Sequence, residues 1–238
     1  MNLMASLSSC LVGAALAASL LTGCGDSDGA DEIFTGTESA ALGAAQNQAA
    51  CITCHGNEPG IKGNSGNSMV DIAYRTSFKG GGATSLLAGA NACVTGWMGG
   101  TALTATDAKW KKLEAYLQSI SDPAVTAPNP LTPEVLASTA AYETAYAGGD
   151  ATAGAAKYAT YCARCHDKGL RLGAVLTPGL ATLKTRAIGA IAQKVRTSGP
   201  PPSSMADTVD ATPGPMPFFE PADLSAADLK DIIAYVRK

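Results

Sequence analysis

The sequence predicts an all-α fold built from two small helical units in tandem. Two stretches, near residues 106–120 and 225–237, place apolar residues at helical spacing along one face. No stretch shows the sustained alternation of polar and apolar residues that a half-buried sheet needs. The 238 residues are enough for two domains of about 100 residues each. We therefore expect two helical bodies.

The composition limits how each body can fill its core. Apolar residues make up 46% of the chain, but aromatic residues make up only 5% and charged residues 16%. Two small bodies with so few large side chains have thin cores, so another bulky group must complete them. The net charge of −3 is too small to favour binding to nucleic acid.

The amino terminus is typical of an export signal with a lipid-attachment site. Residues 11–21 form an uncharged apolar run that is too short to span a membrane. The run leads into Leu-Thr-Gly-Cys, ending at Cys24, which resembles the bacterial lipoprotein cleavage box whose cysteine becomes acylated. The alternative is an ordinary cleavage site with an incidental cysteine. We expect a lipid anchor at the cell envelope, and Gly25 favours the outer membrane, facing the periplasm or the cell surface.

Two further segments divide the rest of the chain. Residues 24–38 contain five acidic residues and no Lys or Arg, which predicts a flexible acidic tether. Residues 123–133 contain four prolines, which block helix and sheet and favour an extended spacer, and a short helix is predicted to follow within 134–147. The predicted boundaries are a signal peptide at 1–23, the tether at 24–37, a first body at 38–122, the linker and short helix at 123–147, and a second body at 148–238.

The two bodies repeat one layout. In each, an Ala-rich stretch precedes the motif C-x-x-C-H, a Gly-containing region and a Met follow, and an amphipathic helix closes the body. Ser225 is the predicted N-cap of the second closing helix. The predicted apolar faces are Trp110, Leu113, Tyr116, Leu117 and Ile120 in the first helix, and Leu229, Ile232, Ile233 and Val236 in the second.

The C-x-x-C-H motif occurs twice and uses both histidines and four of the seven cysteines. Two thiols on one helical turn can reach the two vinyl groups at one edge of a porphyrin, and the adjacent imidazole can then bind the iron. The motifs therefore predict two covalently bound haem c groups, which also supply the missing apolar bulk. The predicted attachment cysteines are Cys51, Cys54, Cys162 and Cys165, and the predicted iron ligands are His55 and His166.

Other chemistries fit the doubled motif poorly. A structural disulfide does not explain the histidine that follows each cysteine pair, and a zinc site lacks a fourth ligand in each copy. A thioredoxin-like pair needs a strand–helix context that is absent here. A Ser-His-Asp triad would need one of the two motif histidines.

The second motif and its surroundings resemble the di-haem class I cytochromes c. Gly154, Tyr158 and residues 162–166 match the amino-terminal helix and attachment site of that family. Pro178 lies twelve residues after His166, where a proline of the family helps a main-chain carbonyl accept a hydrogen bond from the iron-binding histidine.

The resemblance extends over residues 38–238 and implies two tandem class I cytochrome c domains, each a small helical bundle around a covalently attached haem. The first body departs from the family at Asn67, which stands where the proline is expected.

Because both histidines are used, the second axial ligand of each haem must come from another residue type or be absent. Met98 and Met216 each precede the closing helix of their body, where the family places its distal methionine. Met69 and Cys93 are the alternatives in the first body, and Met205 is the alternative in the second. His/Met ligation raises the reduction potential and leaves no position open for oxygen or peroxide, which favours electron transfer over catalysis.

Cys93 is the cysteine left without an assigned role. It can be a small apolar residue of the core, a reactive or intermolecularly bonded thiol, or a thiolate ligand of the first haem. Thiosulfate dehydrogenases are di-haem cytochromes with such a His/Cys haem, and there that haem is catalytic.

We expect an electron carrier rather than an enzyme, one that docks transiently on redox partner proteins. Residues 151–238 carry a net charge of +4, which suits weak, salt-sensitive contact with an acidic partner. The alternatives are a di-haem enzyme such as a thiosulfate dehydrogenase with Cys93 as a ligand, or the cytochrome subunit of a larger membrane dehydrogenase.

Overall fold

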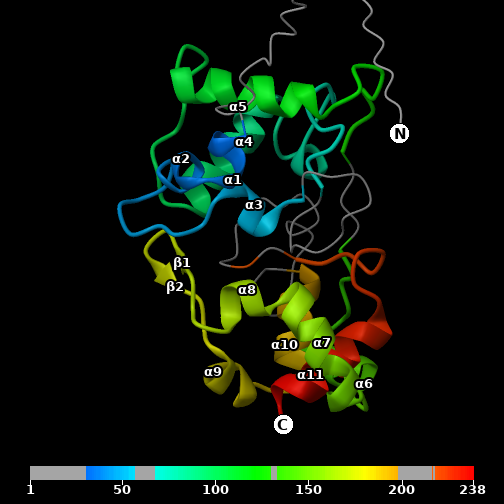
Figure 1. Ribbon diagram of the computed structural model, residues 1–238. Helices are drawn as coiled ribbons and strands as arrows, with labels where there is room; N and C mark the ends of the chain where they lie inside the picture. The colour runs from blue at the N-terminus through cyan, green and yellow to red at the C-terminus, as the bar shows by residue number, and fades with distance from the viewer. Residues whose placement is uncertain (1–30, 57–67, 130–132, 198–215, 217) are drawn as a thin grey trace, which may run out of the picture.

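Helices dominate the described part of the chain, and its buried apolar residues form two separate clusters. The computed structural model describes residues 31–56, 68–129, 133–197, 216 and 218–238. The first cluster draws on residues 33–120 and the second on residues 136–236 (Figure 1). Among the described residues, no helix combines the length and the apolar character that crossing a membrane requires.

The first cluster lies among short helices and two longer ones. Trp110, Leu113, Tyr116 and Leu117 are buried on α5 as predicted, and Ile120 is partly buried just after the helix ends. Asp107 caps this helix through its carboxylate, which accepts a hydrogen bond from the Lys109 amide at 2.8 Å. The elements are α1 Glu32–Thr35, α2 Thr37–Ala40, α3 Cys51–Cys54, the 3₁₀ helix η1 Lys79–Gly81, α4 Leu86–Gly96 and α5 Ala108–Ser119.

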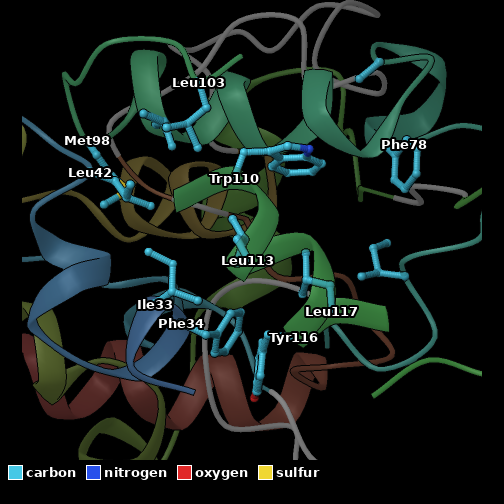
Figure 2. Close-up of a cluster of buried hydrophobic side chains, with 13 residues drawn as sticks. Ile33, Phe34, Leu42, Phe78, Met98, Leu103, Trp110, Leu113, Tyr116 and Leu117 are labelled. Carbon is cyan, nitrogen blue, oxygen red and sulfur yellow. The ribbon is translucent and has the colours of Figure 1, made fainter. Parts of the chain in front are cut away.

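The structure corrects the predicted tether over residues 31–37. Ile33 and Phe34 of α1 are 0% and 1% exposed and belong to the first cluster. Figure 2 shows Phe34 beside Tyr116, and their ring centroids are 5.1 Å apart. Burying two large apolar side chains stabilises this segment by a few kcal/mol, on the order of 1.5–3 for each, which outweighs its acidic composition. Residues 24–30 lie outside the described residues.

The first half of the proline-rich linker lies against the first body. Thr76 donates its amide hydrogen to the carbonyl of Thr126 at 3.0 Å, and Asn129 donates its own to the carbonyl of Ser77 at 3.0 Å. Arg75 Nη1 adds a hydrogen bond of 3.2 Å to the carbonyl of Ala127. These bonds satisfy carbonyl and amide groups of a segment that cannot join a helix or a sheet.

Helices from the beginning and the end of the second body contribute to the second cluster. The helix predicted within residues 134–147 is α6, and its Tyr142 and Tyr146 are buried in this cluster, so it belongs to the second core. Ser225 caps α11 as predicted, because its Oγ accepts a hydrogen bond from the Asp228 amide at 3.1 Å. The helices are α6 Thr139–Tyr146, α7 Ala151–Tyr161, α8 Ala163–His166, α9 Leu180–Lys184, α10 Ile188–Thr197 and α11 Ala226–Val236.

Helices α7 and α11 pack closely because Gly154 has no side chain. A Cβ at Gly154 would lie 1.9 Å from the carbonyl oxygen of Asp231, a distance that only a shift of the main chain can relieve. Lys157 joins the same two helices through ion pairs with Asp228 at 2.6 Å and Asp231 at 2.7 Å. The family resemblance placed Gly154 and Tyr158 in a helix, and Gly154 is also the position at which α7 crosses α11.

A two-stranded antiparallel hairpin extends from the second body. It pairs β1 Arg171–Leu172 with β2 Val175–Leu176, and Gly173 in its turn has φ +59°. Two-residue strands are too short for an alternating pattern, so the sequence gives no signal for them. The hairpin lies at the boundary between the two bodies in Figure 1.

Candidate functional site

The first C-x-x-C-H motif begins with the single turn α3. Thr53 holds this turn, since the Ala50 amide donates to Thr53 Oγ1 at 3.0 Å and the Thr53 amide donates to the Ala50 carbonyl at 2.9 Å. His55 follows with extended main-chain angles, φ −111° and ψ 139°. Both thiols therefore lie on one turn, and the histidine begins the next segment.

Ser39 fixes Cys51 from a neighbouring element. Its side chain is fully buried, and Oγ accepts a hydrogen bond from the Cys51 amide at 2.8 Å and donates to Cys51 Sγ at 3.2 Å. A serine twelve residues before the motif has no recognisable pattern, so this contact has no signal in the sequence.

An apolar cavity of about 200 Å³ lies against the first motif. The structure brings together here the whole motif and every candidate for the distal ligand in the first body. Met98 is 5% exposed at the end of α4, beside Leu42 (Figure 2). The lining residues that bear on chemistry are Cys51, Cys54, His55, Met69, Cys93 and Met98.

Burial controls the acidity of Cys51, the first thiol of this motif. It raises the pKa of Cys51 to about 11, although the hydrogen bond with Ser39 opposes the shift. The proximity of Cys93, which lines the same cavity, adds to the rise. At neutral pH the Cys51 side chain is therefore a thiol. None of the five described cysteines takes part in a disulfide.

The second motif follows directly from α7. The main chain turns at Cys162, with φ −121° and ψ −37°, and continues as α8, which includes His166. The His166 amide donates to the Cys162 carbonyl at 3.0 Å. The second histidine thus lies within a helical turn, whereas the first lies beyond one. Burial raises the pKa of Cys162 to about 12.

The imidazole of His166 is held by the loop that contains Pro178. The distance from Nδ1 to the Pro178 carbonyl oxygen is 2.7 Å, as the family resemblance implies. Nδ1–H donates this bond, which leaves the lone pair on Nε2. Burial lowers the pKa of His166 while the Pro178 carbonyl opposes the shift, and the lowered pKa favours the neutral imidazole.

Thr177 holds the same loop to the motif. It is 8% exposed, its Oγ1 donates to the Cys165 carbonyl at 2.5 Å, and it accepts from the Leu170 amide at 2.7 Å. The sequence marks Pro178 through the resemblance but gives no reason to select its neighbour.

Met216 is partly buried against the second cluster, as is Cys162. The rival Met205 lies outside the described residues.

Arg196 is a buried cation in the second body. Its Nε donates to Tyr146 Oη at 2.8 Å and lies 3.5 Å from a carboxylate oxygen of Glu134, and its Nη1 donates to the Phe219 carbonyl at 3.2 Å. Nη2 is buried and has no hydrogen-bond partner in the part of the chain that the structure describes. An unmatched buried N–H of a guanidinium suits an anionic group such as a carboxylate.

The donor sets fit a covalently attached haem. Each motif offers two thiols and one imidazole. Two methionines, Met69 and Met98, line the first cavity, and Met216 packs on the second cluster. The apolar walls of the first cavity suit the porphyrin, and the unmatched Arg196 N–H suits a propionate.

Residues 149–236 match a family model described as "Cytochrome C oxidase, cbb3-type, subunit III". The match covers the second motif and the helices α7 to α11, and the first motif lies outside it. It supports a cytochrome c domain with covalently bound haem c in this part of the chain, and with it a role in electron transfer. No curated protein and no solved structure matches the chain.

The substitution Thr177→Val tests the support of the His166 loop. Valine keeps the volume but leaves the Leu170 amide and the Cys165 carbonyl without their partner, so the free energy of unfolding is expected to fall by about 1–3 kcal/mol. Denaturant unfolding followed by circular dichroism measures this change. The matched control is Thr185→Val, which removes an exposed hydroxyl bonded only to the Thr182 carbonyl and should change stability by less than about 0.5 kcal/mol. Equal free energies of unfolding for Thr177→Val and the parent protein would contradict the role of Thr177 in supporting the His166 loop.

Proposed function

We propose that the chain is a di-haem c-type cytochrome, lipid-anchored in the cell envelope, that carries single electrons between redox partner proteins. The observation that carries this proposal is the pair of C-x-x-C-H motifs. One lies within the matched cytochrome c region, and the other lines an apolar cavity together with sulfur-bearing candidates for a distal ligand.

Each part of the two sites has a defined role in this proposal. A bound haem c would supply a one-electron ferric–ferrous couple at each motif. The apolar lining of the first cavity limits contact with water, and Pro178 orients the histidine of the second site. The thioether-forming residues are Cys51, Cys54, Cys162 and Cys165, the proximal ligands are His55 and His166, and the distal ligands are Met98 and Met216.

Ligation on both faces favours a carrier over an enzyme, because no coordination position remains for a substrate. Met98 supports this assignment through its burial at the cavity. The partners are proposed to be redox proteins that dock transiently. The description of the matched family as an oxidase subunit is compatible with a partner complex in the membrane.

A second candidate function rests on Cys93. This residue lines the same cavity as His55 and influences the acidity of Cys51, so it is close enough to the motif to compete with Met98. A thiolate ligand there would favour an enzyme such as a thiosulfate dehydrogenase.

The haem content tests the main proposal. The purified holoprotein is expected to contain two haem c groups per chain, measured as the pyridine haemochrome relative to protein determined by amino-acid analysis. The double substitutions Cys51→Ala/Cys54→Ala and Cys162→Ala/Cys165→Ala should each leave one haem, while Cys93→Ala should leave two. One haem in the unsubstituted protein would overturn the di-haem assignment.

The distal ligands separate the carrier from the enzyme. Magnetic circular dichroism of the ferric protein should show two methionine-ligated haems, and Met98→Ala should change only one of them. The spectrum of Cys93→Ala should equal that of the parent protein. A thiolate signal that Cys93→Ala removes, together with reduction of the haem by thiosulfate, would instead establish the enzyme.

The lipid anchor is tested at Cys24, which lies outside the described residues. In cells that make the protein, Cys24→Ser should move it from the membrane fraction to the soluble envelope fraction, because no acyl chain can be attached. Cys10→Ser is the matched control and should leave the protein in the membrane fraction. Membrane attachment that survives Cys24→Ser would disprove the anchor.

A further inference from the structure

The two C-x-x-C-H motifs are hydrogen-bonded directly to each other. Arg164 stands between the two thiols of the second motif, and its Nη1 donates to the main-chain carbonyl of Ile52 at 2.7 Å. Ile52 stands between the two thiols of the first motif, 112 residues earlier. A charged donor makes this bond stronger than one between two neutral groups. In Figure 1, α3 and α8 face each other across the boundary between the two bodies.

The hairpin of the second body makes further specific bonds to the loop before the first motif. The Gln48 amide donates to the Arg171 carbonyl at 2.9 Å, and the Arg171 amide donates to Gln48 Oε1 at 2.9 Å. The Gly173 amide donates to Asn47 Oδ1 at 3.1 Å. Asn47 is itself held, because its Nδ2 donates to the carbonyls of Ala40 and Ala49. These are matched donors and acceptors: the bond to Gln48 Oε1 is exposed, and the bond to the held Asn47 side chain is partly buried.

The close approach at Gly173 shows how tightly the hairpin fits. Its φ of +59° lies in the region that favours glycine. A Cβ at this position would lie 3.0 Å from the carbonyl oxygen of Trp97 and 3.2 Å from that of Met98. The segment that the hairpin contacts therefore includes a proposed iron ligand of the first site.

The second body also completes the first cavity. Leu172 of the hairpin is 7% exposed, and together with Phe218 it lines the cavity that contains Cys51 and His55. The first site thus takes part of its apolar wall from the body that carries the second motif.

From these contacts we infer that the two sites form one electron-exchanging unit whose attachment motifs face each other, with Arg164 as the positioning residue. This inference rests on the proposed di-haem function. In the exchange one electron leaves the reduced site and enters the oxidised one, so that one site is oxidised as the other is reduced, and no proton moves and no bond changes. Electron exchange slows steeply with separation, so bodies held motif to motif exchange electrons faster than bodies joined only by their linker.

The test compares Arg164→Ala with Arg164→Lys and Lys168→Ala in the full-length holoprotein. Arg164→Ala removes the donor, Arg164→Lys keeps a charged donor, and Lys168→Ala removes an equal charge from an exposed position four residues away. Two further measurements accompany the rate of electron exchange between the sites. Hydrogen exchange reports the Gln48, Arg171 and Gly173 amides that bridge the bodies, and pulsed electron paramagnetic resonance reports the separation of the two ferric centres.

Because Arg164 is exposed, its replacement in Arg164→Ala should speed exchange of the bridging amides by about twofold to fivefold, which is the equilibrium effect of losing one exposed charged contact. It should also broaden the distribution of separations and slow electron equilibration after flash reduction. Arg164→Lys should restore most of each property, and Lys168→Ala should match the parent protein. A substitution that lowered only the free energy of unfolding would not change the separation of the two ferric centres.

Gly173→Ala provides a second route to the same opening, from the hairpin side, should Arg164→Ala fail to fold. Two haems with amide protection and separation unchanged in both Arg164→Ala and Gly173→Ala would overturn this inference and leave the di-haem carrier standing. A single haem in the parent protein would instead overturn the proposed function itself.

Discussion

The first core is built around an apolar cavity that lies against its C-x-x-C-H motif. Its buried residues include Phe34, Trp110 and Tyr116, and the cavity has a volume of about 200 Å³. A bulky apolar group that binds there would bury the lining side chains and stabilise the folded chain. The α3 turn and the hairpin supply walls of this cavity, and Ser39 holds the wall at Cys51. The proposed haem is in this sense part of the core.

The second body holds its motif through polar contacts to main-chain groups. Thr177 and Pro178 connect the histidine segment to the following loop, so the ring orientation depends on main-chain groups. Arg196 lies fully buried against Tyr146, whose pKa burial raises to about 12, and the hydrogen bond with Glu134 adds to this rise. Glu134 lies near Nε of this cation, but Nη2 has no partner among the described residues, which is why that donor suits a further carboxylate.

The sequence was most informative where the signal is local. Helical periodicity located α5 and α11, and the resemblance led to the bond between His166 and Pro178. The missed features all depend on contacts between distant positions. The acidic residues around Ile33 gave no indication that it is buried. Ser39 is a single serine in an Ala-rich stretch, and Arg164 occupies a motif position that any residue can take. Its partner lies 112 residues away, and no pattern within one segment can reveal such a pair.

The burial of α1 changes how far the protein can reach from its proposed anchor. Six residues, 25–30, separate Cys24 from Asp31, where the first body begins. Even fully extended, six residues span no more than about 20–22 Å. A chain anchored at Cys24 would therefore keep its first body close to the bilayer surface and could not search a wide volume. Its exchange partners would be proteins that themselves lie at that surface, or soluble ones small enough to approach it.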